Sequence, residues 1–261
     1  MHVQTLSSGS EGNATLVRAG ELSLLIDAGL TARELYKRFD DARITPRLID
    51  HVLVTHGHLD HARSAGIIGK RHEAIVHCAE NIMRNRTLIR APKLAVLRPG
   101  ERIEVANIKT GDKVGIRTVP VPHDCDPTVA FRLDHQDRVV VLVTDIGEPR
   151  AEVAAQLRGA HILLLEFNYD PDSLDRGPYP EMLRRRIRGG RGHLSNDQAA
   201  TMLEWLAGPE LHTLIVTHIS SKNNTAELAR EVATAKLAEM GRSDVEVVIA
   251  SQHEIGPNLA V

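Results

Sequence analysis

The sequence predicts an α/β fold in which two β-sheets are each covered by helices, a four-layer αββα sandwich. Two observations predict it. Short apolar segments typical of strands gather in two parts of the chain, and segments typical of helices flank both groups. The polar residues with the richest chemistry also follow apolar segments directly, which is where open sheets gather their functional groups.

The expected elements begin with short strands and a helix that Thr31 can cap. In this first part we expect strands at 2–6, 14–18, 22–26, 51–55 and 74–77 and helices near 32–39 and 61–72. A strand-rich region follows over 94–143, with turns at Pro99-Gly100 and Gly111-Asp112. In the rest, helices are expected at 149–157, 180–188, 196–207 and 225–240 and strands at 160–166, 211–217 and 244–250.

Length and composition favour one domain over residues 1–261, because the motifs described below run from end to end. Hydrophobic residues make up 42% of the chain but aromatic residues only 3%, so the core must consist of Leu, Val, Ile and Ala. The net charge of −2 gives no global basic field, so a polyanion would have to be held by a local patch.

The sequence also carries signals about location. Its start lacks the basic region and apolar core of a secretory signal, and no apolar run approaches the ~20 residues that span a bilayer. The two cysteines, Cys78 and Cys125, form no CxxC pair. We therefore expect a reduced, cytoplasmic setting without membrane attachment. Oligomeric state is left open.

The densest chemistry lies directly after the apolar segment 51–54. Residues two apart in an extended segment point the same way, so His56 and His58 can bind one cation together. Asp60 and His61, past a turn into a helix, can face a second. Neutral imidazoles and carboxylates suit Zn²⁺, Mn²⁺ or Fe. A histidine-rich surface loop is the simpler alternative, but HxHxDH at a strand end is far more specific than a single HxH.

Four further polar residues stand where apolar segments end, namely Asp27, His123, Asp145 and His218. In this order and spacing the chain resembles the metallo-β-lactamase superfamily over nearly its whole length. The resemblance implies that one metal ion is bound by His56, His58 and His123 and a second by Asp60, His61 and His218, that Asp145 bridges both, and that Asp27 supports the ligand loop without contacting metal.

Other segments narrow the resemblance to one branch. They are Ser8 to Asn13, Leu165 to Asp170, Gly177 to Pro180, Arg185 to Asn196, and Thr217 to Asn224. Together they resemble the YycJ/WalJ branch, whose members are regarded as bacterial metal-dependent nucleases with 5′-to-3′ exonuclease action on DNA. Two positions depart from the branch, Phe167 where a small residue is expected and Gly57 where Glu is common, and neither removes a ligand.

An arginine-rich segment independently favours a phosphodiester substrate. Five arginines fall within residues 184–191, among glycines, directly before His193. Arginine binds phosphate bidentately, and glycine lets a backbone approach closely. We assign Arg188 and Arg191 to substrate phosphate; for Arg184 to Arg186 a solvated helix face is an equal alternative.

Polar side chains near the ligands are further candidates for substrate contact. We assign Ser195, Asn196, Ser220 and Asn223 to the substrate, although the same residue types cap helices, and helices follow both segments. The Ser- and Gly-rich segment 7–13 offers either an anion-binding nest or a plain turn.

The implied reaction uses two cations about 3.5–4 Å apart to activate a bridging water as hydroxide, in line with phosphorus. Asp60 is then both ligand and orienter of the nucleophile. His193 is the candidate donor of a proton to the departing 3′ oxygen, since the ligand set is complete without it. It resembles the non-ligand histidine of ribonuclease Z relatives.

The favoured function is a dinuclear metal-dependent 5′-to-3′ DNA exonuclease that uses Zn²⁺ or Mn²⁺, with Fe as a third option and DNA favoured over RNA. The alternatives are an RNA-processing nuclease and a thioester hydrolase of the glyoxalase II kind. The thioester reading leaves His193 and the arginines without a role. A secreted β-lactamase ranks third, since no export signal exists, and a non-catalytic scaffold is disfavoured because no ligand is missing.

Overall fold

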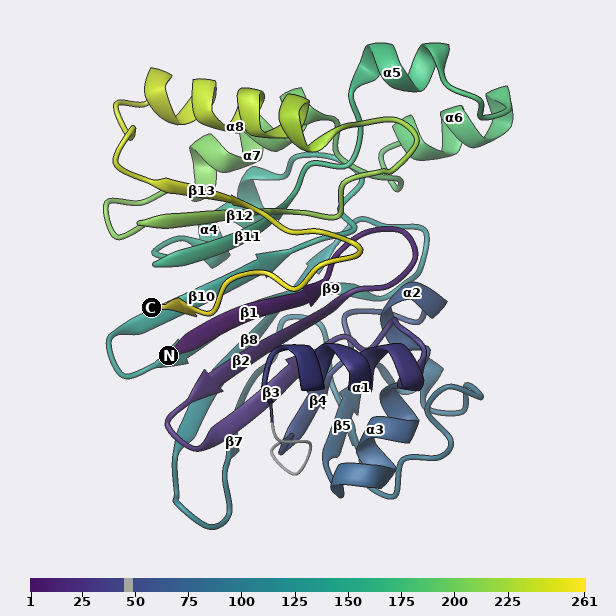
Figure 1. Cartoon of the computed structure of the whole chain (residues 1–261), viewed down its shortest axis with the longest axis vertical. Coiled ribbons are helices and arrows are strands. Elements are labelled where there is room, and N and C mark those ends of the chain that lie inside the picture. Colours follow the sequence, from purple (N-terminus) through teal and green to yellow (C-terminus); the bar gives the residue numbers. More distant parts are fainter. Residues whose placement is uncertain (45–48) are drawn as a thin grey trace. The chain divides into compact units, whose positions relative to one another are not determined.

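The computed structural model describes residues 1–44 and 49–261 (Figure 1). This part of the chain divides into two compact units. The first contains Met1–Thr118, Leu133–Asp137 and Ser251–Val261, and the second contains Val119–Arg132 and Arg138–Ala250. We describe each unit by itself.

The first unit contains a seven-stranded sheet in the order β14-β1-β2-β3-β4-β5-β6. Pairing is antiparallel from β14 through β3 and parallel from β3 through β6. The strands span His2–Ser7 (β1), Ala14–Ala19 (β2), Leu22–Ile26 (β3), His51–Leu53 (β4), Ile75–Cys78 (β5), Leu94–Val96 (β6) and Leu259–Ala260 (β14). Two antiparallel strands follow in the chain, Arg102–Ala106 (β7) and Lys113–Val121 (β8).

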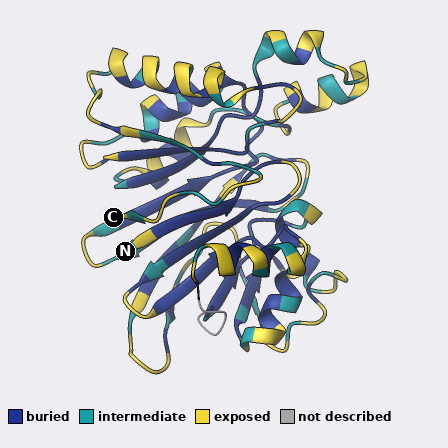
Figure 2. Ribbon diagram, in the orientation of Figure 1, coloured by how far each residue is buried: buried dark blue, intermediate teal, exposed yellow. Residues whose placement is uncertain are grey.

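Helices α1 (Ala32–Asp41) and α3 (Ala65–His72) pack on this sheet (Figure 1). Leu35 and Phe39 of α1 and Ile68 of α3 lie in one apolar cluster with Val52 of β4 and Val76 of β5. The outward faces of these helices are exposed, whereas strands such as β3 are buried at every position (Figure 2). Strands that are buried on both faces explain the nearly continuous apolar runs of the sequence.

The start of α1 follows the sequence prediction. The Thr31 hydroxyl accepts a hydrogen bond from the backbone N–H of Glu34, as an N-cap does. The helix expected over 61–72 is instead two pieces, α2 (Leu59–Ala62) and α3, separated at Ser64. The N–H and hydroxyl of Ser64 donate to the backbone oxygens of Ala28 and Leu30, which interrupts the helix.

The second unit is built on parallel strands. Strands β10, β11, β12 and β13 pair in parallel, and the strand order within this unit is β13-β12-β11-β10-β9. The bounds are Thr128–His135 (β9), Arg138–Val143 (β10), Ile162–Glu166 (β11), Thr213–Thr217 (β12) and Glu246–Ile249 (β13).

Three helices of the second unit pack on one face of its parallel strands (Figure 1). They are α4 (Ala151–Leu157), α7 (Asn196–Leu206) and α8 (Ala226–Glu239), and they share one apolar cluster with β11 and β12. Helices α5 (Pro171–Arg176) and α6 (Glu181–Arg188) instead surround a small cluster of their own, around Leu174 and Ile187. The sequence prediction missed α5 and β14, which have six and two residues.

Within the residues that the structure describes, no helix is both long enough and apolar enough to cross a lipid bilayer.

A buried histidine pair lies in the first unit, on the neighbouring strands β4 and β5. Nδ1 of His51 is 3.0 Å from Nε2 of His77, and Nε2 of His51 is 3.2 Å from the backbone oxygen of Ala106. One proton on each ring satisfies both contacts, so the pair fits best when neutral. Burial, followed by the neighbouring His51, lowers the pKa of His77 to about 4; burial also lowers the pKa of His51.

This pair predicts a loss of stability in acid. In the unfolded chain His77 takes up a proton near pH 6.5, whereas in the folded protein it stays neutral down to about pH 4. The unfolded state therefore binds more protons within this window, and the free energy of unfolding falls as the pH drops through it, by on the order of 2–3 kcal/mol.

Urea unfolding of the wild type and of His77→Gln at pH 7, 5.5 and 4.5 measures this effect. Glutamine can donate to His51 but does not titrate, so the variant should lose less stability in acid than the wild type. His253→Gln, at an exposed position, should follow the wild type. Parallel pH profiles for the wild type and His77→Gln would contradict the prediction.

Candidate metal centre

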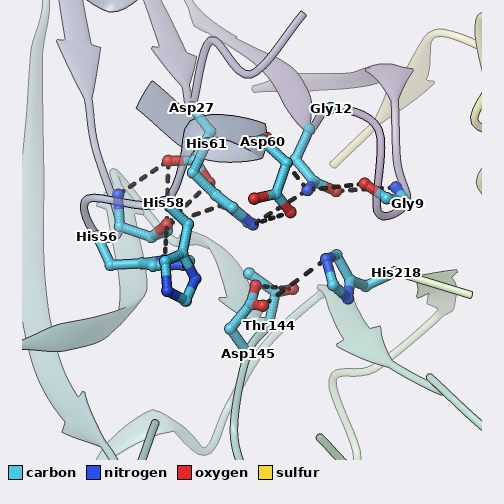
Figure 3. A network of polar contacts seen from close by, with 12 residues as sticks. Gly9, Gly12, Asp27, His56, His58, Asp60, His61, Thr144, Asp145 and His218 are labelled. Atoms are coloured by element: carbon cyan, nitrogen blue, oxygen red, sulfur yellow. Dashed lines mark hydrogen bonds and ion pairs between the residues drawn. The ribbon is translucent and has the colours of Figure 1, made fainter. Parts of the chain in front are cut away.

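In the first unit, Asp27 organises the segment that follows β4. It stands directly after β3 with a left-handed backbone (φ 60°) and is buried. Its Oδ1 accepts the backbone N–H of Thr55 at 2.8 Å and the Thr55 hydroxyl at 3.0 Å. Its Oδ2 lies 2.7 Å from Nδ1 of His61 (Figure 3). Burial raises the pKa of Asp27, and His61 and Thr55 partly oppose this rise.

The predicted ligands of the first unit gather around this support. Contact with Asp27 turns Nδ1 of His61 inward, so its Nε2 faces the Asp60 carboxylate, 3.4 Å away. Nε2 of His56 and Nδ1 of His58 lie 2.9 Å apart (Figure 3). His56 and His61 are buried, and His58 is partly exposed at the start of α2. The structure thus brings together the four HxHxDH side chains, with Asp27 beneath His61.

In the second unit, three acidic or imidazole side chains end three neighbouring parallel strands. Asp145 follows β10, Glu166 is the last residue of β11, and His218 follows β12. Asp145 and His218 have left-handed backbones, with φ of 55° and 54°. Carboxyl ends of adjacent parallel strands meet at one edge of the sheet, which explains why residues so distant in sequence lie together.

Three imidazole nitrogens approach one carboxylate oxygen of the second unit. Nε2 of His123, Nδ1 of His193 and Nε2 of His218 each lie 3.7 Å from Oδ1 of Asp145. Figure 3 shows Asp145 with His218 and with the Thr144 hydroxyl, which donates to its Oδ2 at 2.8 Å. Burial lowers the pKa of His123, which favours the neutral imidazole that binds metal.

Glu166 is a candidate site residue that the sequence prediction missed. It is fully buried, and its carboxylate accepts the backbone N–H groups of Asp145 and Leu194, both at 2.8 Å. Its Oε2 lies 3.2 Å from Nδ1 of His193 and 3.3 Å from Nδ1 of His218. Burial alone would raise the pKa of Glu166, but His193 and then His218 outweigh it and lower the pKa to about 2. A carboxylate that ends an apolar strand, as Asp27 and Asp145 do, was the available signal.

His193 is more exposed than the neighbouring predicted ligand His218. Its side chain is 20% exposed, compared with 3% for His218, and its ring stacks on that of His218 at a centroid distance of 5.2 Å. With Nδ1 facing Glu166, its Nε2 is the nitrogen left to exchange a proton.

The polar residues assigned to substrate are buried and have partners within the second unit. The Ser195 hydroxyl caps α7 in a capping box with Gln198, and Asn196 exchanges side-chain hydrogen bonds with Asn224. The Ser220 hydroxyl accepts from the backbone and side-chain amides of Asn223. These contacts give all four a structural role, and their contact with substrate stays a prediction.

The arginines of α6 and the following loop are paired with acidic groups. Arg188 forms an ion pair with Asp175. Arg191 lies 3.8 Å from the Asp126 carboxylate and also donates from Nε to the backbone oxygen of His123 at 2.8 Å. The side chains of Arg188 and Arg191 are 45% and 62% exposed. Arg184 and Arg185 pair with Glu181, and Arg186 pairs with Asp124 beside His123.

The donor sets fit divalent metal ions. Oxygen or nitrogen atoms of Asp145, Glu166, His193 and His218 lie within 4.8 Å of one another. Buried imidazole nitrogens and carboxylate oxygens that converge in this way are the donors preferred by Zn²⁺, Mn²⁺ and Fe. The supporting carboxylates beneath His61 and His218 are also typical of metal-binding histidines.

Comparison with known proteins places the chain in a family. Residues 23–219 match the family model described as the beta-lactamase superfamily domain, so the chain belongs to the metallo-β-lactamase superfamily. Within it, the chain is 29% identical over 244 residues to the exodeoxyribonuclease YycJ of Bacillus anthracis, covering 92% of this chain and 90% of that protein. It is 28% identical over 236 residues to the exodeoxyribonuclease WalJ of Streptococcus pneumoniae, covering 90% and 87%.

Solved structures share the fold. The metallo-β-lactamase fold protein YhfI from Bacillus subtilis has a TM-score of 0.72 at 17% identity, with 97% of this chain and 98% of that chain covered. Zn²⁺-bound PqqB from Methylobacterium extorquens has a TM-score of 0.70 at 15% identity, with both chains fully covered. These comparisons confirm the predicted αββα fold class and the YycJ/WalJ-like branch, and the chain is a hydrolytic enzyme.

From the contacts of Glu166 we expect the Glu166→Gln variant to bind metal more weakly than the wild type. The amide offers one acceptor oxygen in place of two and turns an N–H group toward atoms that themselves donate. His218 should lose its orientation, and we expect metal affinity to fall roughly 10–100-fold. Competition with a chromophoric chelator measures the change. Glu152→Gln, at an exposed position on α4, should bind metal like the wild type. Unaltered affinity in Glu166→Gln would show that Glu166 does not orient a ligand.

Proposed function

We propose that this hydrolase is a metal-dependent nuclease, and specifically a 5′-to-3′ DNA exonuclease. The observation that carries the proposal is the partly exposed His193, held by the buried Glu166 beside Asp145 and His218. The names of the two exodeoxyribonuclease relatives support the substrate. A cytoplasmic setting, predicted from the cysteines, is part of the proposal.

Two divalent ions, Zn²⁺ or Mn²⁺ with Fe as a third option, fit the predicted ligands. One would be held by His56, His58 and His123, the other by Asp60, His61 and His218, with Asp145 shared. When bound, such ions acidify water and offset charge on a phosphoryl group. Support for this set is the orientation of His61 by Asp27 and of His218 by Glu166.

Other steps of the proposed reaction are assigned to side chains of the protein. The Asp60 carboxylate, 24% exposed, orients the attacking water. His193 donates a proton from Nε2 to the departing 3′ oxygen, and Glu166 stabilises the charged ring before the transfer. Arg188 and Arg191 exchange their exposed pairings for substrate phosphate, which costs little because surface ion pairs are weak.

The pairing of His193 with Glu166 also favours the nuclease over the thioester hydrolase alternative. A thiolate departs without a proton, so a thioester hydrolase needs no general acid at this position, whereas an alkoxide leaving group does. An RNA-processing nuclease uses the same chemistry, and only the substrate distinguishes it.

End-labelled substrates test the proposed function. Duplex DNA, single-stranded DNA, RNA and S-lactoylglutathione are incubated with the enzyme and Mn²⁺ or Zn²⁺, with and without chelator. We expect stepwise release of nucleotides from the 5′ end of DNA, abolished by chelator. Cleavage of RNA alone would select the RNA-processing alternative, and hydrolysis of the thioester alone would overturn the nuclease.

The role of His193 predicts a dependence on the leaving group. His193→Ala should keep its metal content and lose roughly 10²–10⁴-fold in kcat on DNA, the range for a missing general acid. A nitrophenyl phosphodiester should lose much less, because nitrophenolate departs without a proton. Equal losses on both substrates would make His193 a phosphate-binding residue, and a loss of metal would make it a ligand.

A further inference from the structure

The loop of residues 8–13 in the first unit, between β1 and β2, is a turn whose amides are used within the protein. The sequence left open whether this segment forms an anion-binding nest. Five of its six backbone N–H groups donate to acceptors within the unit. Those of Gly9 and Gly12 donate inside the loop, to Asn13 and Gly9. Those of Ser8, Glu11 and Asn13 donate outside it, to Ser251, Gln252 and Asp60. Such a loop serves as a support and not as an anion site.

Gln252, far along the chain, clamps one side of this loop. Its Oε1 accepts the backbone N–H of Glu11 at 2.9 Å. Its Nε2 donates to the Ser7 hydroxyl at 2.7 Å and to the backbone oxygen of Gly12 at 3.0 Å. A Cβ at Gly9 would lie 2.5 Å from Oε1 of Gln252, so glycine is needed for the side chain to reach the loop.

The clamp is itself held by a buried arginine. Arg38 of α1 is 6% exposed and pairs with Glu34 at 3.0 Å. Its guanidinium donates to the backbone oxygens of Gln252 and Leu6, at 3.4 and 3.5 Å. Gln252 is thus fixed through both its backbone and its side chain.

Asn13, at the other end of the loop, contacts the predicted ligands. Its Oδ1 accepts the backbone N–H of Gly9 at 3.0 Å, which sets the orientation of the amide. Its Nδ2 then faces the backbone oxygen of Asp60 at 3.3 Å and Nε2 of His61 at 3.0 Å. The Asn13 backbone N–H also donates to the Asp60 oxygen, at 2.7 Å.

We propose that Gln252 is a positioning residue of the metal centre, which acts through Asn13 on the backbone of Asp60. This inference rests on the ligand set proposed above. Because Asp60 and His61 belong to the same proposed ion, the clamp should affect that ion and leave the ion at His56 and His58 unchanged. A purely structural Gln252 would instead lower the stability of the metal-free protein without such selectivity.

The test measures Zn²⁺ affinities of the full chain by competition with a chromophoric chelator. The variants are Asn13→Ala, Gln252→Ala, Gln252→Glu and the double variant Asn13→Ala/Gln252→Ala, and His61→Ala identifies the affected ion. Glu254→Ala, at an exposed position two residues away, is the matched control. Gln252→Glu keeps the acceptor for Glu11 but loses the donor to Ser7 and Gly12, so it reports even if Gln252→Ala fails to fold.

For the ion at His61 we expect a roughly 10–100-fold loss of affinity in Asn13→Ala. In Gln252→Ala and Gln252→Glu the expected loss is about 2–30-fold. The double variant should lose no more than Asn13→Ala, because both residues act along one path. The other ion and the Glu254→Ala control should stay within about twofold.

Equal losses at both ions, no loss in either Gln252 variant, or additive losses in the double variant would overturn the inference. A wild-type chain that binds fewer than two ions would overturn the proposed metal centre itself, so the two failures are distinguishable.

Discussion

Two buried carboxylates, Asp27 in the first unit and Glu166 in the second, hold His61 and His218 in place. Neither residue is more than 2% exposed. A buried carboxylate is costly unless hydrogen bonds surround it, so each must draw donors from its neighbours. Asp27 takes them from Thr55 and His61, and Glu166 takes them from two backbone amides and two imidazoles. The hydrogen bonds that these carboxylates accept therefore set the positions of the neighbouring backbone segments and imidazole rings.

The second unit uses one carboxylate for two purposes. Oε2 of Glu166 faces both His218, which is buried, and His193, which is partly exposed. In the proposed function, metal binding by His218 and proton transfer by His193 would therefore depend on one support, and the energetic effects of changing these residues should be strongly coupled. A change at Glu166 would remove a contact from both rings at once.

The sequence correctly placed Asp145 and His218 at the ends of apolar strands, and their role as ligands stays a prediction. Sequence reasoning failed where the partner is remote. Glu166 was overlooked as a site residue because its role appears only when its carboxylate meets backbone amides 21 and 28 residues away. Gln252 gave no signal, since its contacts lie more than 200 residues earlier. Short elements such as α5 were missed because few residues carry little periodicity.

The left-handed backbones of Asp27, Asp145 and His218 restrict what can replace them. Side chains other than Gly, Asn and Asp enter this conformation at a cost on the order of 1–2 kcal/mol. Asp27 and Asp145 are thus suited to their positions both by their donor atoms and by their φ angles, whereas His218 adopts this backbone at a cost. Substitutions at these positions should favour asparagine or glycine, because both residues adopt the left-handed backbone although they lack the ionisable group. A homologue with asparagine or glycine at these positions would lack the metal-binding groups but would keep the turns that follow the strands.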